Sequence, residues 1–237
     1  MTEKGREEYV YNQIEQAREM EECLAPSNAP IVQGSPEWKA ARLGKVTASR
    51  VADVVAKTKT GYSSSRANYA AQIVAERLTG TAQESYVNAA MQRGTDTEPE
   101  ARSSYEFYSG QSVVEVGIIP HPTIAQSSAS PDGLVGEDGL VEIKCPNTAT
   151  HIETLLGGSV PGKYQTQIQW QLACTGRQWC DFVSYDNRMP EHMRLFIERV
   201  PRDPARIADL EREVIKFLAE VDAAIAELRQ KYERGQA

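Results

Sequence analysis

Three residues of the sequence have the types and spacing that hydrolytic chemistry needs. Asp132 lies in the segment SPDGLV, and Glu142 and Lys144 lie ten and twelve positions later in VEIKC. The proline and glycine beside Asp132 favour a turn, and the β-branched run VEIKC predicts a strand. Side chains alternate along a strand, so Glu142 and Lys144 are expected on one face. If residues 136–139 form the turn of a hairpin, Asp132 comes close to Glu142.

Carboxylates that converge in this way indicate a metal site. Two negative charges repel unless a positive charge lies between them, and hard oxygen ligands without histidine or thiolate favour Mg²⁺ or Mn²⁺. A lysine beside the metal can orient or help deprotonate an attacking water and offset negative charge in the transition state. In the alternative interpretation, Asp132 is a turn residue and Glu142 and Lys144 are the solvated side of an edge strand. So short a pattern of charged residues often has only this structural role. Here, however, a Pro-Asp turn, a β-branched strand and a stop at Pro146 occur together, and this combination favours the metal site.

The composition is that of a soluble globular protein. The chain has 237 residues, of which 41% are hydrophobic and 25% charged, so one α/β domain with peripheral helices is expected. No apolar run is long enough to span a membrane, and the first residues lack the order of a signal peptide, so we expect a cytoplasmic protein. The four cysteines and three histidines are dispersed, which argues against zinc or an iron–sulfur cluster and favours free thiols.

The net charge of −7 is unusual for a protein that binds a polyanion, because Lys and Arg supply most non-specific affinity for nucleic acids. The charge is unevenly distributed, however. Acidic residues are in excess over the first 25 positions, whereas basic residues are in excess between Trp38 and Arg77. Any basic surface is therefore local, and the net charge alone neither supports nor excludes DNA binding.

The N-terminal half is predicted to be helical. Residues 3–24 have the periodicity of a charged amphipathic helix, and we interpret residues 1–30 as an acidic N-terminal helical arm beside a single domain over residues 31–237. Serine caps, apolar periodicity and glycine stops predict further helices over about 35–44, 48–56, 65–80 and 88–108. The last of these contains Gly94 and Pro99, which are unfavourable inside a helix. The segment 57–65, rich in turn formers, is expected to be a mobile loop.

The period changes at residue 112. Short β-branched runs bounded by glycine and proline predict strands over 112–120, 125–135, 139–146, 178–186 and 193–200. Helices are expected around 150–156 and 162–175, and an apolar stripe predicts a long C-terminal helix over 204–232. The fold class is therefore α/β, with a mixed sheet of about five strands flanked by helices.

Six motifs occur in order along the chain, and together they resemble one family. They are W-x-x-x-R-L-G-x-x-T-A-S from Trp38 to Ser49, G-x-x-x-E-x-x-A-R from Gly94 to Arg102, SPDGL from Ser130 to Leu134, E-x-K-C-P from Glu142 to Pro146, Q-x-Q at Gln167 and Gln169, and Y-D-x-R-M from Tyr185 to Met189. In these residues the chain is similar to the PD-(D/E)xK nuclease superfamily and, within it, to the phage lambda exonuclease or YqaJ-like viral recombinase family. The resemblance extends from about Trp38 to Ile225, and it implies a restriction-endonuclease-like core.

The resemblance implies an enzyme that uses Mg²⁺, with Mn²⁺ as a plausible substitute, to degrade one strand of double-stranded DNA. Degradation would run processively from a 5′-phosphorylated end towards the 3′ end and release 5′-phosphomononucleotides. A homotrimeric ring would thread the DNA and leave 3′ overhangs for a phage single-strand annealing protein in recombination. The alternatives are an endonuclease or an exonuclease of other polarity from the same superfamily, or a non-catalytic DNA-binding adaptor.

The resemblance also implies roles for individual residues. Asp132, Glu142 and the backbone carbonyl of Ile143 would bind the metal, Lys144 would be the catalytic lysine, and Glu98 a further acidic residue of the catalytic site. The residues implied to hold phosphate or DNA are Arg42, Ser49, Ser130, Gln167, Lys59, which would reach into a groove, and Met91, which would separate the strands as an apolar wedge.

Each of these roles has a structural alternative. Glu98 has the features of an exposed helix carboxylate, Arg42 of a cation at a helix end, and Ser49 of a capping residue. Met91 is otherwise a core residue. Because Gln167 and Gln169 bracket one residue of a predicted helix, only one of the two is expected to face the site.

Overall fold

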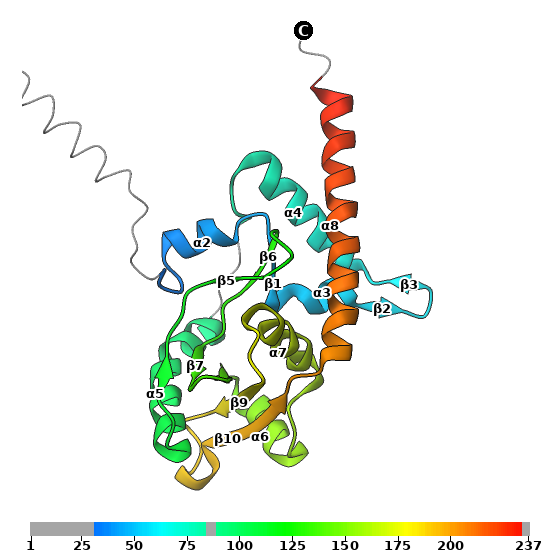
Figure 1. Ribbon diagram of the computed structural model, residues 1–237. Coiled ribbons are helices and arrows are strands. Elements are labelled where there is room, and N and C mark those ends of the chain that lie inside the picture. The colour runs from blue at the N-terminus through cyan, green and yellow to red at the C-terminus, as the bar shows by residue number, and fades with distance from the viewer. Residues whose placement is uncertain (1–30, 84–88, 234–237) are drawn as a thin grey trace, which may run out of the picture. The chain divides into compact units, whose positions relative to one another are not determined.

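The computed structural model describes residues 31–83 and 89–233 of the chain. The helix expected over residues 3–24, and with it the N-terminal arm, lies outside the described residues. Within the described part, helices, a five-stranded sheet and a long last helix follow one another in the expected order (Figure 1). No helix there is long and apolar enough to cross a membrane.

The main sheet has the strand order β10-β9-β8-β7-β4. Its strands are β4 (Val113–Val114), β7 (Gly133–Val135), β8 (Gly139–Lys144), β9 (Trp179–Tyr185) and β10 (Leu195–Pro201). β8 and β9 are parallel and every other neighbouring pair is antiparallel, so the mixed sheet of about five strands is confirmed. A parallel pair needs a crossover, which here contains α6 (Thr148–Gly157) and α7 (Gly162–Thr175).

A second, smaller sheet has the order β1-β6-β5, formed by β1 (Val46–Thr47), β5 (Ile119–Pro120) and β6 (Ser127–Ala129). The strands predicted over 112–120 and 125–135 are therefore wrong as single strands, because each run is divided between the two sheets. Residues 115–118 separate β4 from β5, and the Ser130–Asp132 turn separates β6 from β7. The β-branched pattern is the same on both sides of each break, so it could not indicate where the strand changes sheet.

The helices before the sheet lie where the sequence predicts them, but one predicted loop is wrong. They are α2 (Pro36–Arg42), the 3₁₀ turn η1 (Ala48–Arg50), α3 (Val51–Val55), α4 (Ser64–Thr79) and α5 (Ala89–Ser109), which continues through Pro99. The segment expected to be a mobile loop instead forms a hairpin of β2 (Lys57–Thr58) and β3 (Gly61–Tyr62). Gly61 lies in the left-handed region at φ 143°, which permits the tight turn.

Helix α7 lies between two apolar cores. Trp170 and Cys174 pack into a core shared with α3, α4 and α8, whereas Ile168 and Leu172 pack against the strands of the main sheet. α8 (Pro204–Tyr232) follows the short η2 (Glu191–Met193) and β10. Its first turns cover α3, α4 and α7, and its C-terminal end projects beyond them (Figure 1). The central position of α7 leaves little room for polar groups, so those it carries need a specific partner.

Candidate active site

The β7–β8 hairpin brings Asp132 and Glu142 together, as expected. Gly133 pairs with Val141, so the preceding Asp132 lies opposite Glu142. The Asp132 Oδ2 accepts a hydrogen bond from the backbone N–H of Ile143 at 2.6 Å. Within a strand, the N–H and C=O of one residue point to the same side. The carbonyl of Ile143 therefore also faces the side on which Asp132 lies.

Glu142 is completely buried, with 0% of its surface exposed. Its Oε1 accepts from Gln167 Nε2 at 2.5 Å and contacts Lys144 Nζ, and its Oε2 accepts from Gln171 Nε2 at 2.5 Å. Lys144 retains an exposed fraction of 28%. Strand β8 lies between β7 and β9, so the alternative of a solvated edge strand is wrong.

Asp132, Lys144 and Glu98 have pKa values that are shifted from their usual values. Burial raises the pKa of Asp132 well above its usual value, and Glu142 and Glu98 raise it further, against the opposing effect of Lys144. Burial lowers the pKa of Lys144, but Glu142 and Asp132 outweigh this effect and raise it overall. Burial also raises the pKa of Glu98, although Arg102 lies 3.1 Å from its Oε1 and opposes the shift. A further cation would stabilise these carboxylates in their ionised form.

The donor set fits Mg²⁺ or Mn²⁺. Two carboxylates, Asp132 and Glu142, and the Ile143 carbonyl are hard oxygen donors on neighbouring positions of two paired strands. The described residues contain no group of three or more His, Cys, Asp or Glu side chains that could hold a metal ion. The expected ligand set does not need one, because its third ligand is a backbone carbonyl.

An open cleft of about 540 Å³ lies beside this site and is lined by Ile143 and Lys144, the residues next to the buried Glu142. One wall comes from α5 and includes Met91, Gly94 and Glu98, and the other comes from the end of β8 and the turn after it, including Lys144. Glu98 is therefore part of the site rather than an isolated helix carboxylate. Met91 is 54% exposed at the α5 wall, so its alternative as a core residue is wrong.

Three of the expected phosphate-binding residues lie at one end of the small sheet. Arg42 Nη1 donates to Ser130 Oγ at 3.3 Å, and Trp38 Nε1 donates to the same oxygen at 2.9 Å. β1 and β6 are parallel with Thr47 beside Ser128, so Ser49 and Ser130 each follow two residues later at the same end. The N-cap of η1 is Thr47, so the alternative role of Ser49 as a cap is wrong.

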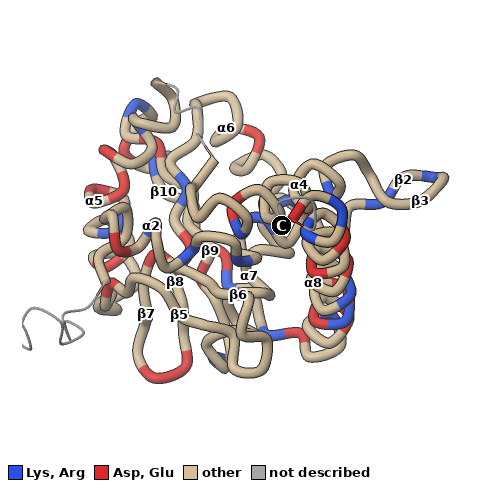
Figure 2. The backbone as a smooth tube through the Cα atoms, turned by 90° about the horizontal axis from the view of Figure 1, so that it is seen from above, with Lys and Arg blue, Asp and Glu red and all other residues tan. Residues whose placement is uncertain are grey.

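Gln167 and Lys59 lie away from this end of the small sheet, as does Met91 at the α5 wall. Gln167 bonds Glu142 and not the Arg42–Ser130 pair. Gln169 donates to the carbonyl of Pro201 at 2.9 Å, so only one of the two glutamines faces the site, as predicted. Lys59 is exposed in the turn of the β2–β3 hairpin, which projects past α3 and α8 on the side away from α5 (Figures 1 and 2).

Comparison with known proteins identifies the family. The model of the YqaJ-like viral recombinase domain matches residues 37–178. The chain belongs to this family. Two crystal structures of the alkaline exonuclease LHK-Exo from Laribacter hongkongensis, one of them in complex with dAMP, are 57% identical to it. Each match covers 84% of this chain and 99% of that chain, with TM-scores of 0.79 and 0.80.

A more distant structure shares only the fold. The phage related exonuclease from Haemophilus somnus 129PT is 15% identical over 78% of this chain and 96% of that chain, with a TM-score of 0.62. Among curated proteins, none matches this chain. The nuclease fold expected from the motifs is thus confirmed by relatives that are exonucleases.

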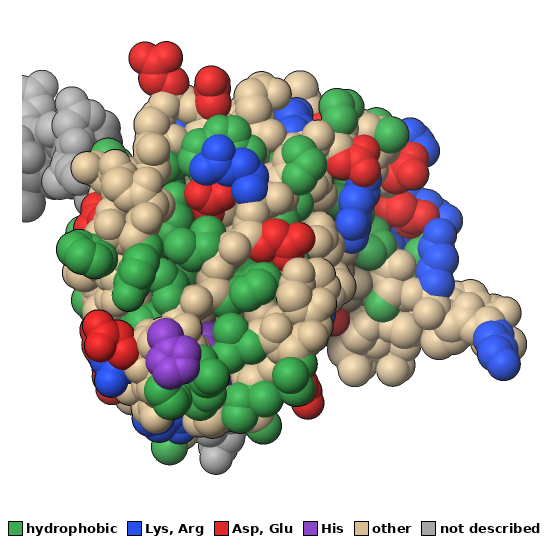
Figure 3. All heavy atoms as spheres, turned by 90° about the horizontal axis from the view of Figure 1, so that it is seen from below, with side chains coloured by type: hydrophobic (Ala, Val, Ile, Leu, Met, Phe, Trp, Pro, Cys, Tyr) green, Lys and Arg blue, Asp and Glu red, His purple; other side chains and the backbone are tan. Residues whose placement is uncertain are grey.

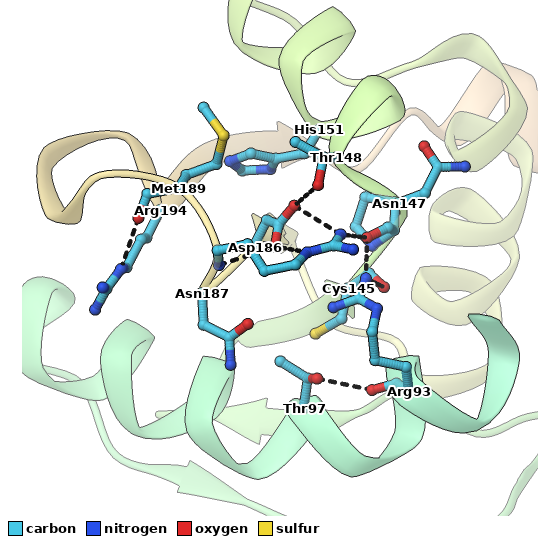
Figure 4. A network of polar contacts seen from close by, with 12 residues as sticks. Arg93, Thr97, Cys145, Asn147, Thr148, His151, Asp186, Asn187, Met189 and Arg194 are labelled. Carbon is cyan, nitrogen blue, oxygen red and sulfur yellow. Dashed lines mark hydrogen bonds and ion pairs between the residues drawn. The ribbon is translucent and has the colours of Figure 1, made fainter. Parts of the chain in front are cut away.

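A polar network fixes the turn that follows Lys144 in this recombinase-family fold (Figure 4). Arg93 Nη2 donates to the carbonyl of Cys145 at 3.1 Å and also to the carbonyl of Pro146. Asp186 Oδ2, at the end of β9, accepts from Thr148 Oγ1 at 2.7 Å. The network therefore joins α5, β9 and the start of α6 around the cleft wall that carries Lys144.

Sequence reasoning missed two residues of this site. Gln171 lies four residues after Gln167, the spacing that places two side chains on one helix face, and this spacing was the available signal. Arg93 had no such signal, because its partners are backbone carbonyls more than fifty positions away. Asp186 was part of a recognised motif, but only the fold shows that it fixes the turn after Lys144.

Proposed function

We propose that this protein is a Mg²⁺-dependent exonuclease that degrades one strand of duplex DNA processively from its 5′ end. The chain is an exonuclease by its family and by its 57% identity to one over nearly all of that enzyme. The observation that supports the metal-dependent chemistry is the proximity of two buried carboxylates, Asp132 and Glu142, to Lys144, which lines the open cleft. A negative cluster with one lysine is suited to phosphodiester hydrolysis with a divalent metal.

Asp132, Glu142 and the Ile143 carbonyl would hold the metal. When bound, Mg²⁺ supplies polarisation of the scissile phosphate and a lower pKa for the attacking water. Lys144, on the same face as Glu142 and open to the cleft, orients that water and offsets negative charge on the phosphate. Glu98, across the cleft on α5, adds a further carboxylate beside the reacting group.

The proposed preference for a 5′ end depends on residues near Asp132. Ser130 precedes Asp132 by two positions and shares its Oγ with Arg42. Burial lowers the pKa of Arg42, but a guanidinium remains charged in proteins, and it pairs well with a terminal phosphate. Ser49 completes this set. Gln167, by contrast, donates to Glu142, and we propose that its main role is to hold that carboxylate. Met91 would separate the two DNA strands at the cleft wall.

Assembly and partners form a further part of the proposal. Lys59 at the hairpin would contact DNA, and a homotrimeric ring would account for processivity. Large apolar side chains are exposed, including Phe107 at 81% and Leu156 at 84%, and Figure 3 shows hydrophobic side chains gathered on the face seen from below. Such surfaces support association with other proteins. We further propose that a phage single-strand annealing protein acts on the product in the cytoplasm.

One digestion experiment tests the chemistry. Linear duplex DNA with and without a 5′ phosphate is incubated with the protein in Mg²⁺ or in chelator. We expect hydrolysis only with Mg²⁺, faster on phosphorylated ends. Lys144→Ala should bind DNA as well as the wild type while its hydrolysis rate falls by about 10²-fold or more. Equal activity in this variant would contradict the mechanism, and a wild type that binds without hydrolysis would favour the adaptor.

A further inference from the structure

Gln171 makes a contact that its position in the fold does not require. It lies on α7 in the interior, with 0% of its surface exposed. Its Nε2 donates to Glu142 Oε2 at 2.5 Å, one helical turn beyond Gln167, which donates to Oε1. Two carboxamides on one helix face therefore bind the two oxygens of one buried carboxylate.

The orientation of the Gln171 amide is fixed by its partner. An ionised carboxylate only accepts hydrogen bonds, so the NH₂ group of Gln171 must face Glu142. As a result, Gln171 Oε1 is buried without a hydrogen-bond partner among the described residues. A buried amide oxygen without a partner destabilises the folded state, and an apolar side chain of similar length would fill the same space without that penalty. Packing alone does not account for a glutamine at this position.

The two amides together restrict Glu142. A carboxylate bonded at one oxygen can still rotate about its last torsion, whereas bonds to both oxygens fix its plane. Gln167 and Lys144 hold Oε1, and Gln171 alone among the described residues is seen to hold Oε2. The lone pairs that remain are thereby fixed relative to Asp132, which is tied to the same strand through the N–H of Ile143.

We propose that Gln171 is a positioning residue that orients Glu142 for a divalent cation, which rests on the proposed metal-dependent function. It touches neither the substrate nor the cation. Partners that orient a metal ligand in this way usually change metal affinity by about 10- to 100-fold when they are removed. The effect of Gln171 is therefore expected in metal binding, more than in DNA binding.

Gln169 offers a matched control on the same helix. It is 2% exposed, and its side chain bonds the carbonyl of Pro201 and the N–H of Asp203 at 2.9 Å each. Gln169 and Gln171 are thus equally buried amides two residues apart that point in different directions. Replacing either by methionine keeps the length of the side chain and removes its hydrogen bonds.

The test compares Gln171→Met and Gln169→Met with the wild type. Binding of Mn²⁺ to the full-length protein without DNA is measured by calorimetry, and the Mg²⁺ concentration for half-maximal hydrolysis is measured separately. Gln171→Met should weaken Mn²⁺ binding and raise the Mg²⁺ midpoint by about tenfold or more, with the Kd for DNA in chelator unchanged. Gln169→Met should leave both metal values within about twofold. If Gln171→Met does not fold, Gln171→Asn, too short to reach Glu142, replaces it.

The outcomes separate this inference from the proposed function. Unchanged metal values for the Gln171 variant, or equal shifts in both variants, would overturn the role of Gln171 and leave the metal-dependent function intact. A wild type that binds no Mn²⁺ and hydrolyses DNA equally in chelator would overturn the proposed function itself.

Discussion

Asp186→Asn removes one negative charge from the network that fixes the turn after Lys144. The wild-type carboxylate is fully buried and accepts from Thr148 Oγ1 at 2.7 Å and from Arg188 Nε and Nη2 at 2.7 and 2.8 Å. Burial alone would raise the pKa of Asp186, but the hydrogen bonds from Arg188 and Thr148 outweigh it and hold the pKa at about 2. The ionised form is therefore the form that the fold stabilises.

Two arguments agree on the size of the effect. A shift from 3.8 to about 2 in the pKa of Asp186 corresponds to about 2 kcal/mol, because one unit is worth ~1.4 kcal/mol. Hydrogen bonds to charged groups contribute about 1.5–3 kcal/mol each. The net loss is smaller than their sum, because asparagine keeps one acceptor oxygen and because water solvates the half-exposed Arg188 in the variant. We expect Asp186→Asn to lose roughly 2–3 kcal/mol of unfolding free energy at pH 7.

The pH dependence has a defined sign. The folded-state pKa of Asp186 lies below the unfolded value, so the stabilisation is complete above about pH 4 and is lost as the pH falls from about 4 towards 2. Urea unfolding of wild type and variant at pH 7, 5, 4 and 3 measures the difference directly. Asp209→Asn, which removes an exposed charge paired with Arg212, is the control and should change little. A difference that is absent at pH 7, or equally large at pH 3, would refute the role assigned to Asp186.

Further predictions concern the substrate end and the sheet. Arg42→Ala should reduce the preference for a 5′-phosphorylated end by about tenfold or more in competition digests, and an unchanged preference would contradict the phosphate assignment. Gly139→Ala should cost about 1–3 kcal/mol in urea unfolding, because its Cβ would lie 2.1 Å from a ring carbon of Trp179; wild-type stability would show that the ring moves freely. Met91→Ala should slow digestion of duplex DNA more than of single strands, and Lys59→Ala should shorten each run of digestion, increasingly at higher salt. Intact rate and processivity in both variants would remove both assignments.

The arrangement of the carboxylates was predictable because the signals are local. A Pro-Asp turn, a short loop and a β-branched strand are enough to pair Asp132 with Glu142, and strand alternation is enough to place Lys144 beside Glu142. The stripe of α8 was predictable for the same reason, since Ile207, Leu210 and the apolar residues that follow it at helical spacing form its buried face.

The rest depended on the tertiary fold. Whether β8 is an edge or an interior strand is decided by β9, which follows more than thirty residues later, so the sequence left Glu142 open to being a solvated residue. The exposure of Met91 depends on how α5 packs against the end of β8. The division of residues 112–135 between two sheets depends on β1, which pairs with β6 from eighty positions away.

The most direct test of the central proposal is the order in which labels leave linear duplex DNA. The duplex carries a label at one 5′ end or one 3′ end and is digested in Mg²⁺, with covalently closed circles alongside. We predict that the 5′ label is released first as a mononucleotide, that the 3′ label is released last, and that the circles remain intact. Release of the 5′ label last, or cutting of the circles, would contradict the proposed 5′ exonuclease.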